Sequence, residues 1–288
     1  GGDVIKYYEE NINLRVDKAS VAAQTVKGVL NQHVVYYSKQ FDDQTARNEE
    51  LKRDLKLAIK NDEFVAFYQP KVDINSGKLV GAEALIRWQT KDNRLIPPGD
   101  FIPLSEKTGL VTDLDMIVFE KVLAFLRRSL DEGIECVPIS VNFSRLHFSN
   151  EKFLPTLLQK MEKYQVPAHL IELELTDSAI FDNFSIIYDF TEKVREYGVA
   201  VAMDDFGSGY SSRRYLAVLP FSTIKLDKAF IHPLPHSPSY TSLVKNLIPA
   251  LHELGFTVIG EGVESMAQYS MLERLGCDYM QGFFLARP

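Results

Sequence analysis

The chain has 288 residues, of which 45% are hydrophobic and 25% are charged, a composition typical of soluble globular proteins. Its formal net charge of −7 argues against a general electrostatic grip on nucleic-acid polymers or anionic membranes, while a local metal site could still bind a small phosphorylated ligand. No apolar run approaches the length of a membrane span, and no signal peptide is visible. We therefore expect a cytoplasmic fragment of a longer protein, whose full-length form could be membrane-anchored upstream.

The N-terminal part does not match a complete domain. Residues 16–30 have a helical pattern and residues 34–37 resemble a strand, but one helix and one strand cannot bury a core alone. We therefore interpret residues 1–41 as a partial segment. Residues 42–62 are interpreted as a connector, because residues 47–61 carry an apolar stripe among charges. The stripe could dock on the main body or on a partner chain, or the helix could be a solvated spacer.

From residue 63 to residue 288, strand-like segments alternate with helical ones. This alternation predicts a mostly parallel sheet, and the number of repeats favours a closed α/β barrel over an open sheet. No dinucleotide-type glycine motif follows the central strand, which weakens the open-sheet alternative. The predicted strands are residues 64–72, 78–88, 137–142, 170–176, 199–204, 223–227, 257–261 and 279–284, and the predicted helices are residues 98–108, 112–132, 151–164, 183–197, 211–218, 239–254 and 265–275.

The central strand, which begins at Val199, runs directly into two adjacent acids. Because side chains alternate along a strand, Asp204 shares a face with small alanines, opposite a bulky apolar stripe. Asp205 would point away if the strand continued, but the glycines in residues 206–209 indicate that it ends there. Two acids aimed into one space need cations, a bound metal or a shared proton. A bare Asp-Asp pair could equally be an acidic surface turn.

The other predicted strands repeat this arrangement, because each delivers a polar side chain near its carboxyl end. In an α/β barrel these ends line one mouth, where active sites lie. The group consists of Glu83, Asn142, Glu174, Asp204, Asp205, Lys225, Asp227 and Glu261. Oxygen donors without a histidine cluster suit Mg²⁺ or Mn²⁺ better than Zn²⁺. So many carboxylates could hold two ions, an arrangement that promotes attack on phosphate esters.

At these residues the chain resembles a known family, the EAL-domain cyclic-di-GMP phosphodiesterases. The resemblance covers residues 64–288 and begins with Glu83-Ala84-Leu85 followed by Arg87. It implies a modified (β/α)₈ barrel whose first strand is antiparallel to the rest. It also implies hydrolysis of cyclic di-GMP to linear pGpG with Mg²⁺ or Mn²⁺. Further matching motifs are Tyr68-Gln69-Pro70, Pro98 with Phe101-Ile102-Pro103, Ser140-Val141-Asn142, residues 172–176, Asp204-Asp205-Phe206-Gly207, Ile224-Lys225-Leu226-Asp227, Glu261-Gly262-Val263-Glu264 and Gln281-Gly282.

The resemblance also implies roles for individual residues. The ligands of one metal are Glu83, Asn142, Glu174 and Asp204, and Asp204 bridges to a second metal beside Asp205. The catalytic group comprises Lys225, Glu261, Asp205 and Gln281. Lys225 corresponds to the residue that orients or deprotonates the attacking water, which would suit a lowered pKa beside two dications. The substrate-contacting or water-positioning group comprises Gln69, Leu85, Arg87, Pro98, Asp227 and Glu264.

One departure from the family pattern concerns the loop that carries Asp205. The family usually has glutamate three residues after the Glu174 position as the anchor of this loop, whereas this chain has Asp177. A shorter anchor could reduce activity, or could make it depend on dimerisation. The rival interpretation is therefore a weak or inactive receptor for cyclic di-GMP.

The partners are inferred from the same resemblance. We expect cyclic di-GMP as substrate or ligand, a homodimer formed through the barrel, and no nucleic-acid polymer. Residues 1–41 weakly resemble the end of a GGDEF domain, which indicates an upstream GGDEF or sensor domain in the full-length chain.

Overall fold

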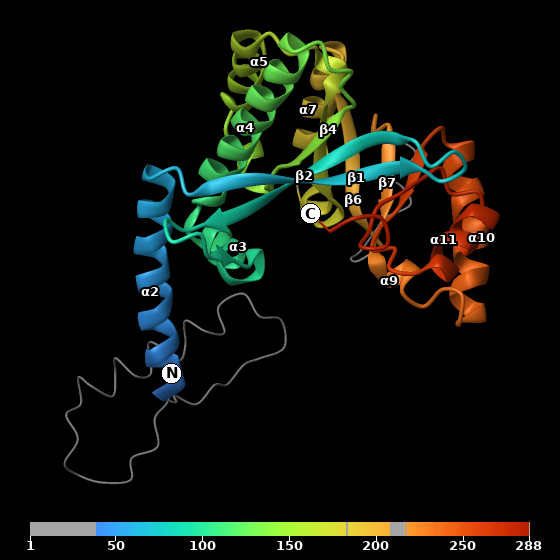
Figure 1. Ribbon diagram of the computed structural model, residues 1–288, viewed down its shortest axis with the longest axis horizontal. Coiled ribbons are helices and arrows are strands. Elements are labelled where there is room, and N and C mark those ends of the chain that lie inside the picture. Colours follow the sequence, from blue (N-terminus) through green and yellow to red (C-terminus); the bar gives the residue numbers. More distant parts are fainter. Residues whose placement is uncertain (1–38, 183, 208–215, 217, 288) are drawn as a thin grey trace. The chain divides into compact units, whose positions relative to one another are not determined.

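A computed structural model describes residues 39–182, 184–207, 216 and 218–287 (Figure 1). The chain divides into two compact units, residues 1–57 and residues 58–288. Helix α2 (Lys39–Lys60) covers residues 47–60 of the helix predicted at residues 47–61 and begins eight residues earlier. The predicted helix at residues 16–30, the predicted strand at residues 34–37 and residues 211–215 of another predicted helix lie outside the described residues.

The unit from residue 58 onward is built on a closed eight-stranded barrel. Strand β1 (Phe64–Asp73) pairs antiparallel with both β2 and β9 and so closes the sheet, while all neighbouring pairs from β2 through β4 to β9 are parallel. The predicted fold, with its antiparallel first strand, is confirmed. The other barrel strands are β2 (Leu79–Gln89), β4 (Ile139–Asn142), β5 (Ile171–Thr176), β6 (Ala200–Phe206), β7 (Thr223–Leu226), β8 (Thr257–Gly260) and β9 (Tyr279–Met280); the short strand β3 (Leu95–Ile96) extends β2 on the outside.

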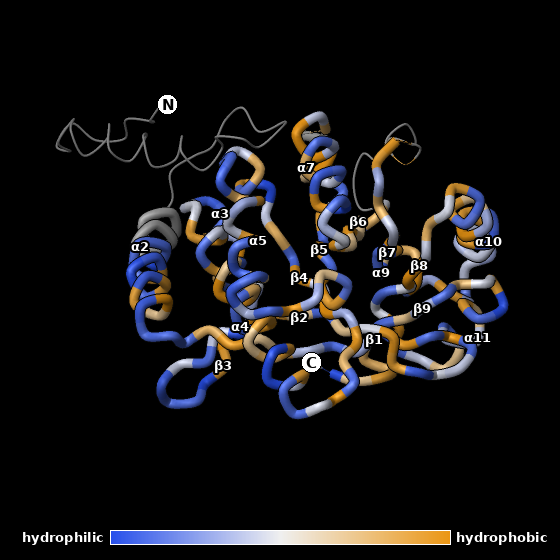
Figure 2. The backbone as a smooth tube through the Cα atoms, turned by 90° about the horizontal axis from the view of Figure 1, so that it is seen from above, coloured by the Kyte–Doolittle hydropathy of each residue, from blue (hydrophilic) through white to orange (hydrophobic). Residues whose placement is uncertain are grey.

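Helices cover the outside of the barrel (Figure 2). Helices α4, α5 and α7 lie on one flank of the strands, and α10 and α11 lie on the other (Figure 1). Two short helices, α6 and α9, were not predicted. The described helices after α2 are α3 (Pro98–Thr108), α4 (Val111–Asp131), α5 (Phe153–Tyr164), α6 (Asp177–Asp182), α7 (Phe184–Glu196), α9 (Lys228–Ile231), α10 (Pro238–Glu253) and α11 (Met266–Arg274), with 3₁₀ turns η1 (Arg145–Ser149) and η2 (Ala168–Leu170).

Local sequence signals fix the ends of several elements. Helix α11 begins with a capping box, in which Ser265 accepts a hydrogen bond from the backbone of Gln268 and the Gln268 side chain returns to the cap. Helix α3 begins with Pro98 and ends at Gly109, whose left-handed backbone suits glycine. The β1–β2 turn is held by Asp73, whose carboxylate accepts hydrogen bonds from Ser76 at 2.7 Å.

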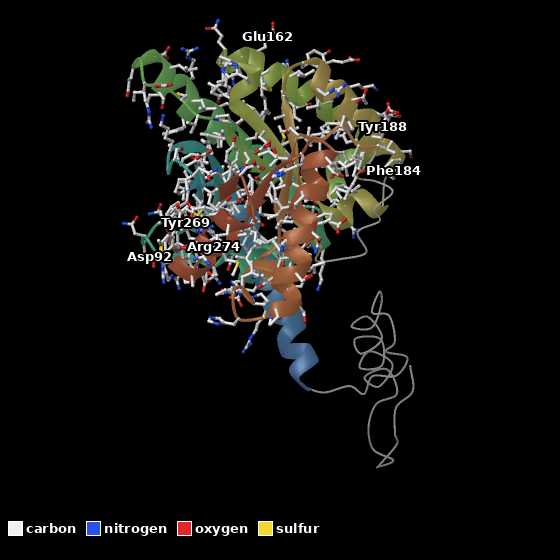
Figure 3. The ribbon with its side chains drawn as sticks, turned by 90° about the vertical axis from the view of Figure 1, so that its right-hand side faces the viewer. Asp92, Glu162, Phe184, Tyr188, Tyr269 and Arg274 are labelled. Atoms are coloured by element: carbon white, nitrogen blue, oxygen red, sulfur yellow. The ribbon has the colours of Figure 1, made fainter. Side chains whose placement is uncertain are left out.

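The apolar core lies between the barrel and its helices. Val201 and Met203 on β6 are buried there, as are Ile187 and Val194 on α7. The side chains of α11 join the same layer, and Tyr269 donates a hydrogen bond to the Ile74 carbonyl oxygen at 2.8 Å (Figure 3). Because the bulky stripe of β6 faces the helices, its alternate residues face the barrel interior, as predicted.

The last predicted strand is much shorter than expected. Strand β9 ends at Met280 instead of residue 284, and the following chain turns against the segment after β8. The backbone N–H of Val263 donates to the Gln281 carbonyl oxygen at 3.1 Å, and a Cβ atom at Gly282 would lie 2.2 Å from the Val263 carbonyl oxygen. This close approach, which only glycine permits, takes the chain out of the sheet.

We predict that Gly282→Ala destabilises the barrel by about 1–3 kcal/mol, because the added methyl group must displace backbone atoms. Urea unfolding of both proteins measures the difference. The matched control is Gly99→Ala in the first turn of α3, where an added Cβ meets nothing within 4 Å. Equal stability of the two variants would contradict the prediction.

Candidate active site

Polar side chains from the strand ends meet at one end of the barrel interior. Glu83 on β2 is level with Ser140 on β4, and Asn142 is level with Glu174 on β5. Asn142 donates a hydrogen bond from its amide to Glu83 Oε1 at 2.7 Å. The alternation rule therefore predicted correctly which face of each strand carries these groups.

The centre of this cluster is the ammonium group of Lys225 on β7. Its Nζ lies 3.1 Å from Glu83 Oε2 and 2.8 Å from Glu174 Oε2. It also lies 3.0 Å from Asp204 Oδ1 and 2.8 Å from Glu261 Oε1, and the lysine side chain is only 1% exposed. Although burial lowers the pKa of a lysine, these carboxylates raise the pKa of Lys225 well above its ordinary value. This direction applies to the site without bound metal, so the lowered pKa expected beside two dications stays a prediction.

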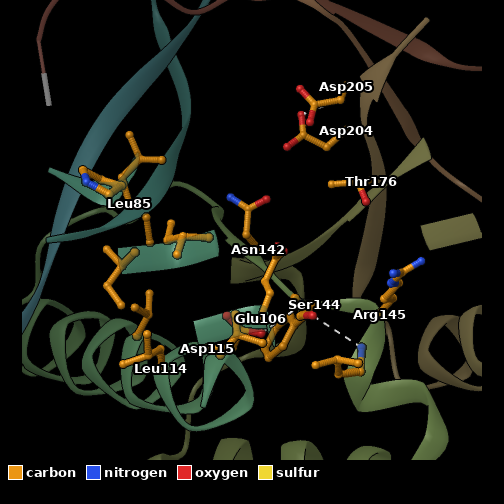
Figure 4. Close-up of a pocket in the computed structure, with 18 of the residues that line it drawn as sticks. Leu85, Glu106, Leu114, Asp115, Asn142, Ser144, Arg145, Thr176, Asp204 and Asp205 are labelled. Carbon is orange, nitrogen blue, oxygen red and sulfur yellow. Dashed lines mark hydrogen bonds between the residues drawn. The ribbon is translucent and has the colours of Figure 1, made fainter. Parts of the chain in front are cut away.

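Asp204 and Asp205 lie side by side because β6 contains a bulge. Met203 pairs with Ile224 on β7, and Phe206 pairs with Leu226. Two residues lie between the paired positions on β6 but only one lies between them on β7, so β6 has one extra residue. Asp205 has φ 55°, and its backbone N–H donates to Asp204 Oδ1 at 3.0 Å. The strand ends at Phe206, directly before Gly207. The bulge, not the end of the strand, brings the second carboxylate round to the first, and Asn142 points toward both (Figure 4).

The carboxylates form two overlapping groups that can hold a divalent cation. One group is Glu83, Glu174 and Asp204, and the other is Asp204, Asp205 and Glu261. Within each group, one oxygen from every residue lies within 4.8 Å of the others. Asp204 belongs to both groups, which is the position that a bridging ligand would occupy.

The charge balance of the interior also fits metal binding. Six carboxylates face the two ammonium groups of Lys71 and Lys225, which leaves a formal charge of −4 when all are ionised. Burial, together with neighbouring carboxylates, raises the pKa of Glu83 and raises that of Glu261 well above its ordinary value. Gln281 Oε1 is buried without a hydrogen-bond partner. An interior with excess negative charge and an unpaired oxygen has the donor chemistry that Mg²⁺ and Mn²⁺ prefer.

A cleft of about 800 Å³ opens beside this cluster (Figure 4). Asn142, Asp204 and Asp205 line one part of it, and three of the predicted substrate-contacting residues, Leu85, Arg87 and Pro98, line another. Arg87 is partly buried, and its Nη1 donates to its neighbour's carbonyl oxygen at 2.8 Å. Its guanidinium carbon lies 5.6 Å from the centre of the Phe67 ring.

The other predicted substrate-contacting residues do not line the cleft. Gln69 lies in the barrel interior, where its Oε1 accepts a hydrogen bond from Gln281 Nε2 at 2.9 Å. Asp227 caps helix α9 by accepting from the Ala229 backbone at 2.7 Å. Glu264 is exposed, with its carboxylate 3.8 Å from His232 Nε2.

Asp177, the predicted loop anchor, is buried at the first position of α6. Most of the loop that it was expected to anchor, residues 208–215, lies outside the described residues. Its anchoring role therefore stays a prediction.

The sequence analysis missed several interior and cleft residues, of which Lys71 and Asp115 are two. Lys71 on β1 is buried and contacts Glu172 and Glu174. Asp115 on α4 lines the cleft and accepts from His147 Nε2 at 3.1 Å. Alternation with Gln69 could have placed Lys71 on the interior face, whereas nothing in the sequence distinguishes Asp115 from other helix acids.

Comparisons with known proteins agree with this geometry. The family model described as "EAL domain" matches residues 52–288. The chain is 35% identical to signaling protein YkoW of Bacillus subtilis over 94% of its length, and 37% identical to bifunctional diguanylate cyclase/cyclic di-GMP phosphodiesterase MucR of Pseudomonas aeruginosa over 83%. It spans about a third of the length of these relatives, 34% and 35%.

A solved structure of the PaMucR phosphodiesterase in complex with c-di-GMP superposes with a TM-score of 0.78 at 36% sequence identity. The match covers 83% of this chain and 97% of that one. None of the described helices is long and apolar enough to cross a membrane. The family match spans most of the sequence, and the barrel with its carboxylate mouth agrees with it, so the chain belongs to the EAL domain family.

Proposed function

We propose that this chain hydrolyses cyclic di-GMP to linear pGpG with the help of two divalent cations. The observation that carries the proposal is the pair of carboxylate groups that share Asp204 beside an open cleft. The name of MucR contains two activities, diguanylate cyclase and cyclic di-GMP phosphodiesterase. This chain matches nearly the whole of the PaMucR phosphodiesterase structure, which supports the phosphodiesterase activity.

The chain's residues divide naturally between two ions. Glu83, Glu174 and Asp204, with Asn142 beside them, would hold the first, and Asp204, Asp205 and Glu261 would hold the second. Two bound cations would polarise the phosphate, activate water and stabilise the leaving oxygen. Their combined charge would balance the formal −4 of the interior, and either Mg²⁺ or Mn²⁺ suits these oxygen ligands.

The cleft supplies the contacts that would bind the dinucleotide. Arg87 offers a planar set of donors for a phosphate oxygen or a guanine edge. Leu85 and Pro98 add apolar surface for the base or the ribose. This arrangement would present one phosphodiester to Asp204 and Asp205, which line the same cleft.

Lys225 would act as a fixed hydrogen-bond donor. Its contacts with Asp204 and Glu261, at 3.0 and 2.8 Å, would let it orient these carboxylates and the attacking water. In the reaction, the water oxygen forms a bond to phosphorus while the P–O3′ bond breaks. The water would lose one proton to solvent in the open cleft, and the 3′ oxygen would take one proton from the same solvent as it departs, so no net proton is left on the protein.

The alternative function is a receptor that binds cyclic di-GMP without cleaving it. The shorter side chain at Asp177 favours this alternative, whereas the complete set of carboxylates favours the enzyme. Incubation with cyclic di-GMP and Mg²⁺ or Mn²⁺, followed by chromatography, separates the two. A pGpG peak that a chelator removes supports the enzyme, and intact nucleotide with binding by calorimetry supports the receptor.

Two features of the full-length protein also stay predictions. We propose a homodimer through the barrel and an upstream GGDEF or sensor domain. Sedimentation of the chain with and without cyclic di-GMP measures the first.

We predict that Glu83→Ala and Asp204→Asn each lower kcat by more than about 100-fold, because each removes a metal ligand that nothing nearby replaces. Asp204→Asn should be the more severe, since Asp204 belongs to both carboxylate groups. The rate of pGpG formation measures the effect, with the exposed Glu162→Ala as control. Wild-type turnover in either site variant would exclude the two-metal assignment.

We also predict a pH-dependent effect of Asp205 on stability. Burial and the charges of Asp204 and Asp227 raise the pKa of Asp205 to about 6, from 3.8 in the unfolded chain. Ionising Asp205 therefore lowers the free energy of unfolding progressively from about pH 4 to about pH 6, and the full loss remains above pH 6.

In a chelating buffer, Asp205→Asn should melt at a higher temperature than the wild type above about pH 6, and the difference should vanish near pH 4. Added Mn²⁺ should reverse the order at neutral pH, because only the carboxylate binds the cation well. Differential scanning calorimetry provides the measurement. Identical melting curves at every pH would contradict the argument.

A further inference from the structure

Lys71 enters the barrel interior from the one antiparallel strand. It lies opposite Gly81 on β2, and a Cβ atom at Gly81 would lie 3.6 Å from Lys71 Cδ. The aliphatic part of the lysine thus passes close over a position that has no side chain. Its ammonium group reaches the interior, and the side chain is only 5% exposed.

The ammonium group of Lys71 contacts two acids of β5. Its Nζ lies 2.8 Å from Glu172 Oε2 and 2.9 Å from Glu174 Oε1. These acids are two residues apart, so both face the interior, and Glu172 lies deeper in the barrel than Glu174. The other oxygen of Glu172 accepts a hydrogen bond from Thr223 Oγ1 at 3.0 Å. Glu172 is thus held at both oxygens and belongs to neither metal-binding group.

Glu174 is held differently at its two oxygens. Oε1 faces Lys71, whereas Oε2 faces Lys225 at 2.8 Å, on the side of the other metal-binding carboxylates. Lys225 is shared among four acids from four segments, whereas among the described residues Lys71 forms ion pairs with β5 alone. Lys71 therefore determines which oxygen of Glu174 is available at the mouth.

We propose that Lys71 is a positioning residue for the reaction: it holds Glu174 Oε1 against the deeper Glu172, so that Glu174 offers Oε2 alone to the metal. This inference rests on the proposed function for its catalytic consequence, but its effect on metal binding can be measured without it. Residues that orient a metal ligand typically contribute 10–100-fold to metal affinity or activity.

The test compares the wild type with Lys71→Met, which keeps an unbranched side chain one atom shorter than lysine and removes its charge. Electron paramagnetic resonance of the protein titrated with Mn²⁺ measures binding directly, without nucleotide. We expect the Mn²⁺ concentration at half-saturation to rise about 10–100-fold and kcat to fall about 10–100-fold. KM for cyclic di-GMP should change less than about threefold, because Lys71 does not line the cleft.

The direction of the effect separates positioning from charge. Loss of a positive charge alone would strengthen cation binding, so Mn²⁺ binding equal to or tighter than in the wild type overturns the proposal. The matched control is Lys160→Met, which removes a half-buried ion pair with Glu120 between α5 and α4 and should leave Mn²⁺ binding unchanged.

A second variant separates positioning from mere stabilisation. Lys71→Met leaves Glu172 without its partner and could lower the melting temperature. In the double variant Lys71→Met/Glu172→Gln, the deeper charge is removed as well. If the double variant regains the wild-type melting temperature but still binds Mn²⁺ weakly, the proposal is supported. If Mn²⁺ binding returns to the wild-type level, or if the double variant does not fold, Lys71 has a structural role and the proposal is overturned.

A wild type that binds Mn²⁺ but does not hydrolyse cyclic di-GMP would contradict the proposed function alone. The Mn²⁺ titration of Lys71→Met would still decide the positioning role. A wild type that binds no Mn²⁺ would overturn both.

Discussion

The contact between Lys225 and four carboxylates determines how the rest of the barrel interior is arranged. A buried ammonium group costs several kcal/mol to desolvate, and so does each buried carboxylate, unless they satisfy one another. Here the acids come from β2, β5, β6 and the segment after β8, so their mutual compensation requires the barrel to close in one register. The same contact keeps Lys225 protonated and fixes the carboxylates in place. Structure and chemistry thus depend on one group.

The two buried lysines neutralise only part of the carboxylate charge, and the remaining negative charge would favour the binding of a cation. Two ammonium groups cannot neutralise six acids, so the interior keeps its excess of negative charge near the mouth. The deeper acid, Glu172, is fully engaged by Lys71 and Thr223, whereas Asp205 lines the cleft and has a raised pKa. This difference between the deeper and the outer carboxylates would direct a divalent cation to the end of the barrel beside the cleft.

Much of this arrangement could be predicted because parallel strands obey a simple rule. A polar residue that faces the interior near the carboxyl end of a parallel strand reaches the mouth, which placed Glu174 and Asp204 correctly. Alternation alone placed Glu83, which lies near the middle of β2. The rule fails where the backbone departs from regular geometry. Asp205 reaches Asp204 only through a bulge with a left-handed residue, and β9 ends early because Gly282 packs against Val263. Neither departure changes the hydrophobic pattern, so the sequence carries little signal for it.

The rule also fails for β1, and here the reason is direction. Gln69 is level with Glu83, while Lys71, further along the chain, is level with Gly81 and therefore deeper in the barrel. In every parallel strand, the later residue lies nearer the mouth; in β1 it lies nearer the bottom. An antiparallel strand can thus place a long cationic side chain beneath the acids. At the same depth, each parallel strand has only the residues with which it begins. The reversed strand supports the carboxylates proposed to bind metal from below, a position that the ends of the parallel strands cannot reach.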